Sequence, residues 1–165
     1  MEKITAAIHK HRKVKGQGLV EFALTLPLLL MLLFGIIEFG RLLFFYSAVT
    51  TAAREAARYG SAAGGYGGSG NYYQDCDGIR AAAKRIGVFA GVSDGDINIT
   101  YDEGPGSTAF GSCPVGGTGP ELSRGYRIIV EVSAEFTPIV PLVNLQSFDI
   151  ESVARRSIFK NVSVN

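Results

Sequence analysis

An uncharged and almost entirely apolar stretch runs from Phe22 to Ile37 and constrains this chain more than any other feature. As a helix, its 16 residues would rise about 24 Å, slightly less than the roughly 30 Å of a bilayer's hydrocarbon layer. A second apolar run, Leu42 to Tyr46, follows an interruption in which Glu38 and Arg41 are spaced for pairing. We therefore predict a single tilted membrane helix from about Gly18 to Tyr46.

Two other interpretations of this stretch remain open. A secretory signal peptide also combines a basic segment with a following apolar one, and small residues do occur at positions 47–53. Its apolar region would be too long here, however, and Pro27 and the charged positions 38 and 41 fit that pattern poorly. A buried helix of a fully soluble protein is the weaker alternative.

Charge is distributed unevenly along the chain, although the formal net charge is only +1. Residues 1–16 carry five basic side chains against the single acid Glu2, together with both histidines, His9 and His11. By the positive-inside rule, this basic flank stays in the cytoplasm and the C-terminal part lies outside the membrane. The small net charge argues against binding of nucleic acid, which requires many basic contacts to phosphate.

Catalytic chemistry is poorly supported beyond the basic segment. No histidine follows His11, so the commonest general base and zinc ligand is missing from the rest of the chain. We therefore expect a protein that is not an enzyme, with no metal site, no cofactor and no small-molecule substrate.

The alanine-rich residues Ser47 to Tyr59 continue the helical composition, with Arg54, Glu55 and Arg58 on a polar side. We expect a basic leader over residues 1–16 and one helix over residues 17–59, in which an exposed stalk follows the membrane span. Glycine-rich residues 60–75 form a linker. Residues 76–165 then form a small extracytoplasmic domain.

This domain is expected to have an α+β fold. A helix is predicted over Ile79–Phe89, with Asp77 as its N-cap and an end near Gly91. Alternation of apolar residues predicts three strands, and alternate residues of the middle strand should pack on that helix. The result is a small antiparallel sheet with one face covered by a helix. The strands are predicted at residues 97–101, 126–136 and 148–159.

The two cysteines, Cys76 and Cys113, both fall in the region placed outside the membrane. A pair in an oxidising compartment is most simply a disulfide, which would stabilise the domain by about 3–4 kcal/mol for a loop of this length. Metal binding is the alternative, although no histidine is nearby. Acidic residues at 75–77 and 94–96 resemble parts of calcium loops, but the full pattern is missing, so turn-forming and capping roles are favoured.

The junction between the basic segment and the apolar helix contains an acid, Glu21, within an apolar segment. A carboxylate at the bilayer centre costs about 2.5–3.5 kcal/mol, and less near the edge, so Glu21 requires a partner. If the chain is cut after Gly16, the new amine of Gln17 lies four residues from Glu21 on the same helix face. The two charges would then compensate, within one subunit or between neighbours.

Several segments of the sequence together match a known family pattern, namely residues 16–24, 26–30, 36–41 and 52–59, and more weakly 126–141. With these segments the chain resembles TadE-like pseudopilins of the tight-adherence (Flp, type IV) pilus system. The resemblance implies that a prepilin peptidase cuts the bond between Gly16 and Gln17. It also implies that Glu21, with the adjacent Phe22, acts in processing or assembly as the acid five residues into the mature chain.

The function implied by this resemblance is that of a minor pilin or pseudopilin, a structural component of a pilus or secretion assembly. Its partners would be the prepilin peptidase, other pilin or pseudopilin subunits, and membrane lipid. We expect close helix packing in the bilayer at Gly35 and Gly40, and a bend or a change of tilt at Pro27. The alternative is a membrane-anchored extracytoplasmic binding domain that keeps its leader.

Overall fold

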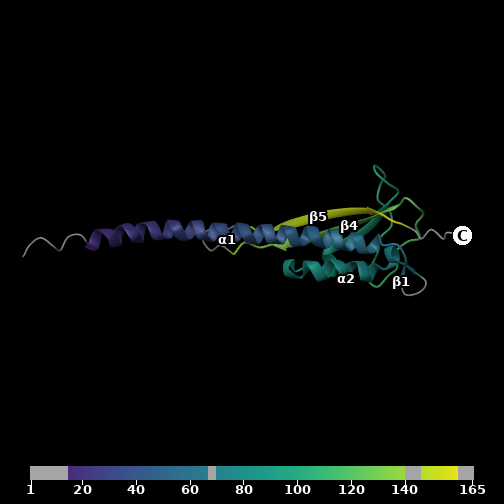
Figure 1. Ribbon diagram of the computed structural model, residues 1–165, viewed down its shortest axis with the longest axis horizontal. Coiled ribbons are helices and arrows are strands. Elements are labelled where there is room, and N and C mark those ends of the chain that lie inside the picture. Colours follow the sequence, from purple (N-terminus) through teal and green to yellow (C-terminus); the bar gives the residue numbers. More distant parts are fainter. Residues whose placement is uncertain (1–14, 67–69, 140–145, 160–165) are drawn as a thin grey trace, which may run out of the picture. The chain divides into compact units, whose positions relative to one another are not determined.

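A computed structural model describes residues 15–66, 70–139 and 146–159 (Figure 1). Residues up to Gly40, together with Ile139, form a first compact unit. Arg41–Pro138 and the described residues from 146 onward form a second unit. A long N-terminal helix is followed by a small domain with a helix and a three-stranded antiparallel sheet, so the predicted α+β class is confirmed.

Helix α1 (Lys15–Gly60) agrees closely with the predicted helix and contains Pro27 in its interior. Within the described part of the chain, one helix is long and apolar enough to cross a membrane, Gly16–Gly60, with a mean hydropathy of 2.4 in its most apolar window. Length and composition thus make α1 a candidate membrane anchor.

The C-terminal part of α1 belongs to the core of the second unit. The ring of Phe45 lies 5.3 Å from that of Phe136, and a face of small side chains is completely buried. The expected exposed stalk is therefore wrong for this face, whereas Arg54 and Arg58 are exposed as predicted. The buried residues of this face are Val49, Ala52, Ala53, Ala56 and Ala57.

The length of the sheet explains why two helices, α2 and α1, are needed to cover its apolar face. Its strands are β3 (Ile97–Asp102), β4 (Arg127–Phe136) and β5 (Phe148–Ser157), antiparallel in the order β3-β4-β5. The ten residues of β4 extend about 33 Å, whereas the 12 residues of helix α2 (Cys76–Gly87) extend about 18 Å. Because α2 is too short to cover the apolar face, α1 covers the remainder (Figure 1).

Strand register places most of the apolar residues of the three strands on one face. Ile99 and Ala154 both pair with Val130, and the alternating residues of β4 are buried as predicted. The other face is mainly polar, although it includes Ile129 and Val153, and on it Asn98 donates a hydrogen bond of 3.1 Å to Glu131. The sheet is thus apolar toward the helices and mainly polar on the opposite face.

Part of the predicted glycine-rich linker has regular structure. The short strands β1 (Gly65–Tyr66) and β2 (Gly70–Asn71) pair with each other, and a 3₁₀ turn, η1 (Tyr72–Gln74), follows. Tyr73 in this turn is 2% exposed and belongs to the core.

Helix α2 starts earlier than predicted, and the N-cap is Asp75 instead of Asp77. The Asp75 carboxylate accepts a hydrogen bond of 3.0 Å from the amide of Gly78. Asp77 lies in the first turn and accepts a hydrogen bond of 2.9 Å from the amide of Gly116. The helix continues into the 3₁₀ turn η2 (Val88–Ala90). As predicted, the chain then turns at Gly91, which has a left-handed φ of 71°.

Candidate processing and assembly site

The first turns of α1 contain the four residues that the sequence predicts to act in processing and assembly. Gly16 lies in the first turn, and the side-chain amide of Gln17 donates a hydrogen bond of 3.2 Å to the Glu21 carboxylate. This contact confirms that positions 17 and 21 share a helix face. Phe22 follows and is 63% exposed. The basic residues 1–14 lie outside the described residues.

The glycines of this part of α1 have no close neighbour among the described residues outside their own helix backbone. A Cβ atom added at Gly16, Gly18, Gly35 or Gly40 would meet no such atom within 4 Å. Packing among the described residues therefore does not explain why these positions lack a side chain.

Pro27 lies inside α1 and has no backbone N–H. The carbonyl of Ala23, four residues earlier, therefore lacks its helical donor. Thr25 is close to this interruption, and its hydroxyl donates a hydrogen bond of 3.1 Å to the carbonyl of Phe22. A bend at Pro27 stays a prediction.

Large apolar side chains are exposed along α1 in the first unit. Exposure of so many neighbouring apolar groups to water is unfavourable, and a continuous apolar surface of this kind marks contact with lipid or protein. The exposed fractions run from 37% at Leu26 to 74% at Leu24. Other members include Leu19, Val20, Leu28, Leu29, Leu32, Leu33, Ile36 and Phe39.

The segment that follows β4 contacts α1 in both units. In the first unit, the amide of Ile139 donates a hydrogen bond of 3.2 Å to the carboxylate of Glu38. In the second unit, Arg41 places its guanidinium 5.2 Å from the centre of the Phe136 ring and donates to the carbonyl of Thr137 at 3.5 Å. Glu38 and Arg41, the two charged residues that interrupt the apolar run, therefore also contact backbone groups just after β4.

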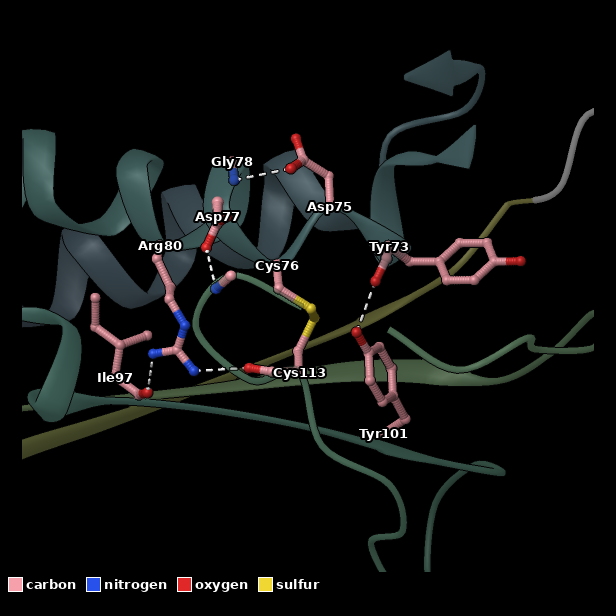
Figure 2. Close-up of a disulfide and its surroundings, with 10 residues drawn as sticks. Tyr73, Asp75, Cys76, Asp77, Gly78, Arg80, Ile97, Tyr101 and Cys113 are labelled. Atoms are coloured by element: carbon pink, nitrogen blue, oxygen red, sulfur yellow. Dashed lines mark hydrogen bonds between the residues drawn. A yellow bond between two sulfur atoms is a disulfide. The ribbon is translucent and has the colours of Figure 1, made fainter. Parts of the chain in front are cut away.

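A disulfide joins Cys76 at the start of α2 to Cys113 in the loop between β3 and β4 (Figure 2). This pairing agrees with the sequence-based prediction. The two Cα atoms are 5.2 Å apart, and both residues are buried. The disulfide therefore connects this long loop directly to the helix.

Arg80, one turn further along α2, reinforces the same connection. Its side chain is buried and donates to three backbone carbonyls, two of which Figure 2 shows. These carbonyls belong to Asp94 at 2.9 Å, Ile97 at 2.6 Å and Cys113 at 2.7 Å. Sequence reasoning missed this role, although a single arginine between Ile79 and an alanine run is a signal that such a side chain is partly enclosed.

Tyr101 connects the sheet to the glycine-rich part of the chain. Its hydroxyl donates a hydrogen bond of 2.6 Å to the carbonyl of Tyr73 (Figure 2). Burial raises the pKa of the Tyr101 hydroxyl, with a further contribution from Tyr73. The hydroxyl therefore stays a neutral donor. Gly119 lies so close to this hydrogen bond that a side chain there would clash with Tyr101 and Tyr73.

A hollow of about 270 Å³ lies beside the start of α2. Two acids, Asp75 and Asp77, line it, and both have structural roles. Asp75 accepts hydrogen bonds from the Tyr59 hydroxyl at 2.6 Å and from Gly78, and Asp77 accepts one from Gly116. Among the described residues, no group of three acids, cysteines or histidines has the geometry to hold a metal ion. The lining residues are Gly70, Asn71, Gln74, Asp75, Asp77, Gly117 and Thr118.

Comparison with known protein families agrees with the family resemblance found in the sequence of α1. The family model described as TadE-like protein matches residues 16–58. This match confirms the resemblance to TadE-like proteins over almost all of α1 and indicates a component associated with the Tad pilus. Among curated proteins and among solved structures, no match to the chain was found.

Proposed function

We propose that this chain is a minor pilin or pseudopilin-like structural component of a tight-adherence pilus or secretion assembly, and that it has no enzymatic activity. The match to TadE-like proteins over residues 16–58 carries the proposal. It begins at Gly16, the residue that precedes the expected cut. The apolar surface of α1 supports the same role, because a pilin helix must be accommodated first by lipid and then by neighbouring subunits.

In this proposal a prepilin peptidase cuts the bond between Gly16 and Gln17. The bond lies in the first turn of α1, where the backbone amides have no partner within the helix. The chain can therefore unwind there at little cost when a peptidase binds it. No described residue outside the helix's own backbone lies within 4 Å of a Cβ atom added at Gly16, which supports a role for its small size in binding the peptidase.

After the cut, Glu21 neutralises the new amine of Gln17. The observed hydrogen bond between the Gln17 side chain and Glu21 supports this role, since it shows that the carboxylate is oriented toward that end of the helix. A paired carboxylate is far less costly in lipid than an isolated one. Phe22, next to Glu21, would contact a neighbouring subunit or the peptidase.

The basic leader stays in the cytoplasm and the second unit lies outside the membrane. The basic segment before the apolar helix supports this orientation through the positive-inside rule. The Cys76–Cys113 disulfide supports it independently, because such bonds form in oxidising compartments. The proposed partners are the peptidase, other pilin or pseudopilin subunits and membrane lipid.

The mass of the membrane-bound chain tests the processing step. We expect the loss of residues 1–16 in cells that contain the peptidase. Gly16→Leu should retain the leader, whereas Gly18→Leu, a change at an equally open glycine two residues away, should be processed. Retention of the leader by the unaltered chain would instead favour a permanently anchored extracytoplasmic binding domain.

Variants beyond the cut test the assembly step. Glu21→Ala should be processed but should co-purify poorly with other pilins, because the amine has lost its partner. Pro27→Ala should insert and be processed normally but should change cross-links formed through cysteines placed at Leu32 or Ile36. Unchanged co-purification and cross-links for both variants would show that α1 is simply an anchor.

A further inference from the structure

We propose that the 3₁₀ turn η2, which carries Val88 and Phe89, lies in the interfacial layer of the membrane beside α1. The second unit would then contact lipid directly through a second point in addition to its helix. This inference goes beyond the proposed function and rests on one part of it, namely that α1 spans the membrane.

The first observation is the exposure of two neighbouring apolar side chains at the end of α2. Val88 is 62% exposed and Phe89 is 73% exposed. Both follow the last turn of the helix, where the chain reverses at Gly91. A soluble domain gains nothing from presenting a phenylalanine ring to water at such a turn, whereas a lipid surface gives the ring an apolar environment.

The second observation connects this turn to the apolar part of α1. The ring of Phe89 packs edge to face on that of Phe44, with the ring centres 5.9 Å apart. Phe44 itself is 56% exposed. The exposed apolar side chains of α1 beyond Arg41, which include Leu43 and Phe44, therefore continue onto η2 through this contact.

Helix length then places this contact relative to the bilayer. A hydrocarbon layer of about 30 Å accommodates about 20 helical residues, so a span that begins at Phe22 ends near Arg41. The interfacial layer adds about 5–7 Å on each side, which corresponds to residues 42–46. Phe44 lies within this range, and its contact with Phe89 places η2 in the same layer.

The other side chains at this edge of the second unit have the composition of a membrane interface. Arg41 lies over the ring of Phe136, and the ring of Phe148, 47% exposed, lies 5.5 Å from the same ring. Arginine beside exposed phenylalanine rings suits the boundary between headgroups and acyl chains, where the guanidinium reaches the headgroups and the rings lie among apolar chains. The chemistry of this edge therefore fits a lipid surface better than bulk water.

The absence of tryptophan from the sequence allows a direct test. Phe89→Trp places a single fluorophore on η2 of the full chain, reconstituted in vesicles of phosphatidylcholine and phosphatidylglycerol. Phe159→Trp is the matched control, because Phe159 is 70% exposed and follows the opposite end of β5. The ten residues of β5 separate that end from Phe148 by about 33 Å. Leu32→Trp reports separately whether α1 is inserted.

We expect Trp emission at position 89 to be shifted to shorter wavelength relative to position 159. Lipids brominated close to the headgroup should quench it strongly, and aqueous iodide should quench it weakly. At position 159 both quenching results should be reversed. Equal emission and equal quenching at the two positions would overturn the proposal.

Two further outcomes would also overturn it in identifiable ways. Protection from iodide at position 89 without quenching by brominated lipid would show that protein, such as a second copy of the chain, covers η2. Failure of deep brominated lipids to quench the fluorophore at position 32 would show that α1 is not inserted, which also contradicts the proposed function. Far-ultraviolet circular dichroism of each variant verifies that the fold is retained.

Discussion

The guanidinium of Arg80 donates a hydrogen bond of 2.7 Å to the carbonyl of Cys113, the same residue that the disulfide joins to α2. One loop residue is therefore held to one helix by a covalent bond and by a charged donor one turn further along. The loop of residues 103–126 has little apolar surface to bury and contains many glycines. The disulfide and the hydrogen bond from Arg80 therefore hold this loop in place of hydrophobic packing.

Removal of the Arg80 side chain should destabilise the second unit. Arg80→Met leaves three backbone carbonyls without this donor, and each buried one costs about 1–3 kcal/mol. We expect the free energy of unfolding to fall by at least about 2 kcal/mol, measured by urea denaturation. Arg85→Met is the control on the same helix. Its side chain is 70% exposed, and its loss should cost no more than about 0.5 kcal/mol.

The disulfide should stabilise the folded second unit, because it restricts the unfolded chain. Cross-linking residues separated by 37 positions restricts the unfolded chain and contributes about 3–4 kcal/mol. The double variant Cys76→Ala, Cys113→Ala should therefore unfold at a distinctly lower urea concentration. Because both cysteines are buried, reductant should act on the unaltered protein only when it unfolds. Rapid thiol labelling of the folded, unreduced protein would contradict the pairing.

Asp102 and Arg127 face each other across β3 and β4 and should make stability depend on pH. Arg127 donates hydrogen bonds of 2.7 and 2.6 Å to the two carboxylate oxygens. These bonds hold the pKa of the Asp102 carboxyl below its usual value, although burial opposes the shift. The folded state therefore favours the ionised form. The resulting stability is present above the unfolded-state pKa of about 3.9 and is lost as pH falls through the lower folded-state pKa.

Urea denaturation of Asp102→Asn at several pH values checks this prediction. The variant should be less stable than the unaltered protein at pH 6, and the difference should shrink steadily below pH 4. Glu135→Gln, at an exposed acid on β4, is the control. A constant difference between Asp102→Asn and the unaltered protein across this range would show that the ion pair contributes nothing that depends on ionisation.

Gly119 should tolerate no side chain, because it lies against the contact between Tyr101 and Tyr73. A Cβ atom there would come within 2.7 Å of the Tyr101 hydroxyl oxygen and 2.8 Å of the Tyr73 carbonyl oxygen. Gly119→Ala should therefore break this buried hydrogen bond and lower the free energy of unfolding by about 1–3 kcal/mol. Gly95→Ala is the matched control, since its nearest neighbour would be 3.8 Å away. Equal thermal midpoints for the two variants would contradict the prediction.

Local patterns in the sequence predicted most of the secondary structure. Alternation over 126–136 identified β4 almost to the residue, and the uncharged run from Phe22 identified α1. Such signals are local, because a strand repeats every two residues and a helix about every 3.6. The N-cap was misassigned by two residues, since Asp75 and Asp77 carry the same chemical signal and only the fold distinguishes them.

Relations between distant segments could not be predicted in this way. The alanines from Ala52 to Ala57 have high helix propensity whether they are exposed or buried, so their composition did not show that they contact the sheet. The Asp102–Arg127 pair depends on the register of β3 against β4, and the contacts of Arg80 depend on where two loops return. By contrast, Gln17 and Glu21 are close along one helix, so their relation was predictable.

The burial of the alanine face leads to a last prediction, which concerns where the outer domain begins. The side chains of Val49, Ala52, Ala53, Ala56 and Ala57 contribute seven fully buried carbons. At about 0.8 kcal/mol for each buried carbon, they stabilise the second unit by roughly 6 kcal/mol. This is as large as the total stability of many small domains.

A fragment of residues 41–165 should therefore fold, whereas one of residues 60–165 should not, although a division at the end of the helix looks natural from the sequence. Cooperative thermal unfolding and dispersed amide resonances should distinguish the two fragments. Within the longer fragment, Ala53→Leu should destabilise by about 1–3 kcal/mol through overpacking, and Arg54→Leu on the exposed face should have little effect. Cooperative unfolding of the shorter fragment with the same midpoint as the longer one would show that α1 is dispensable to this core.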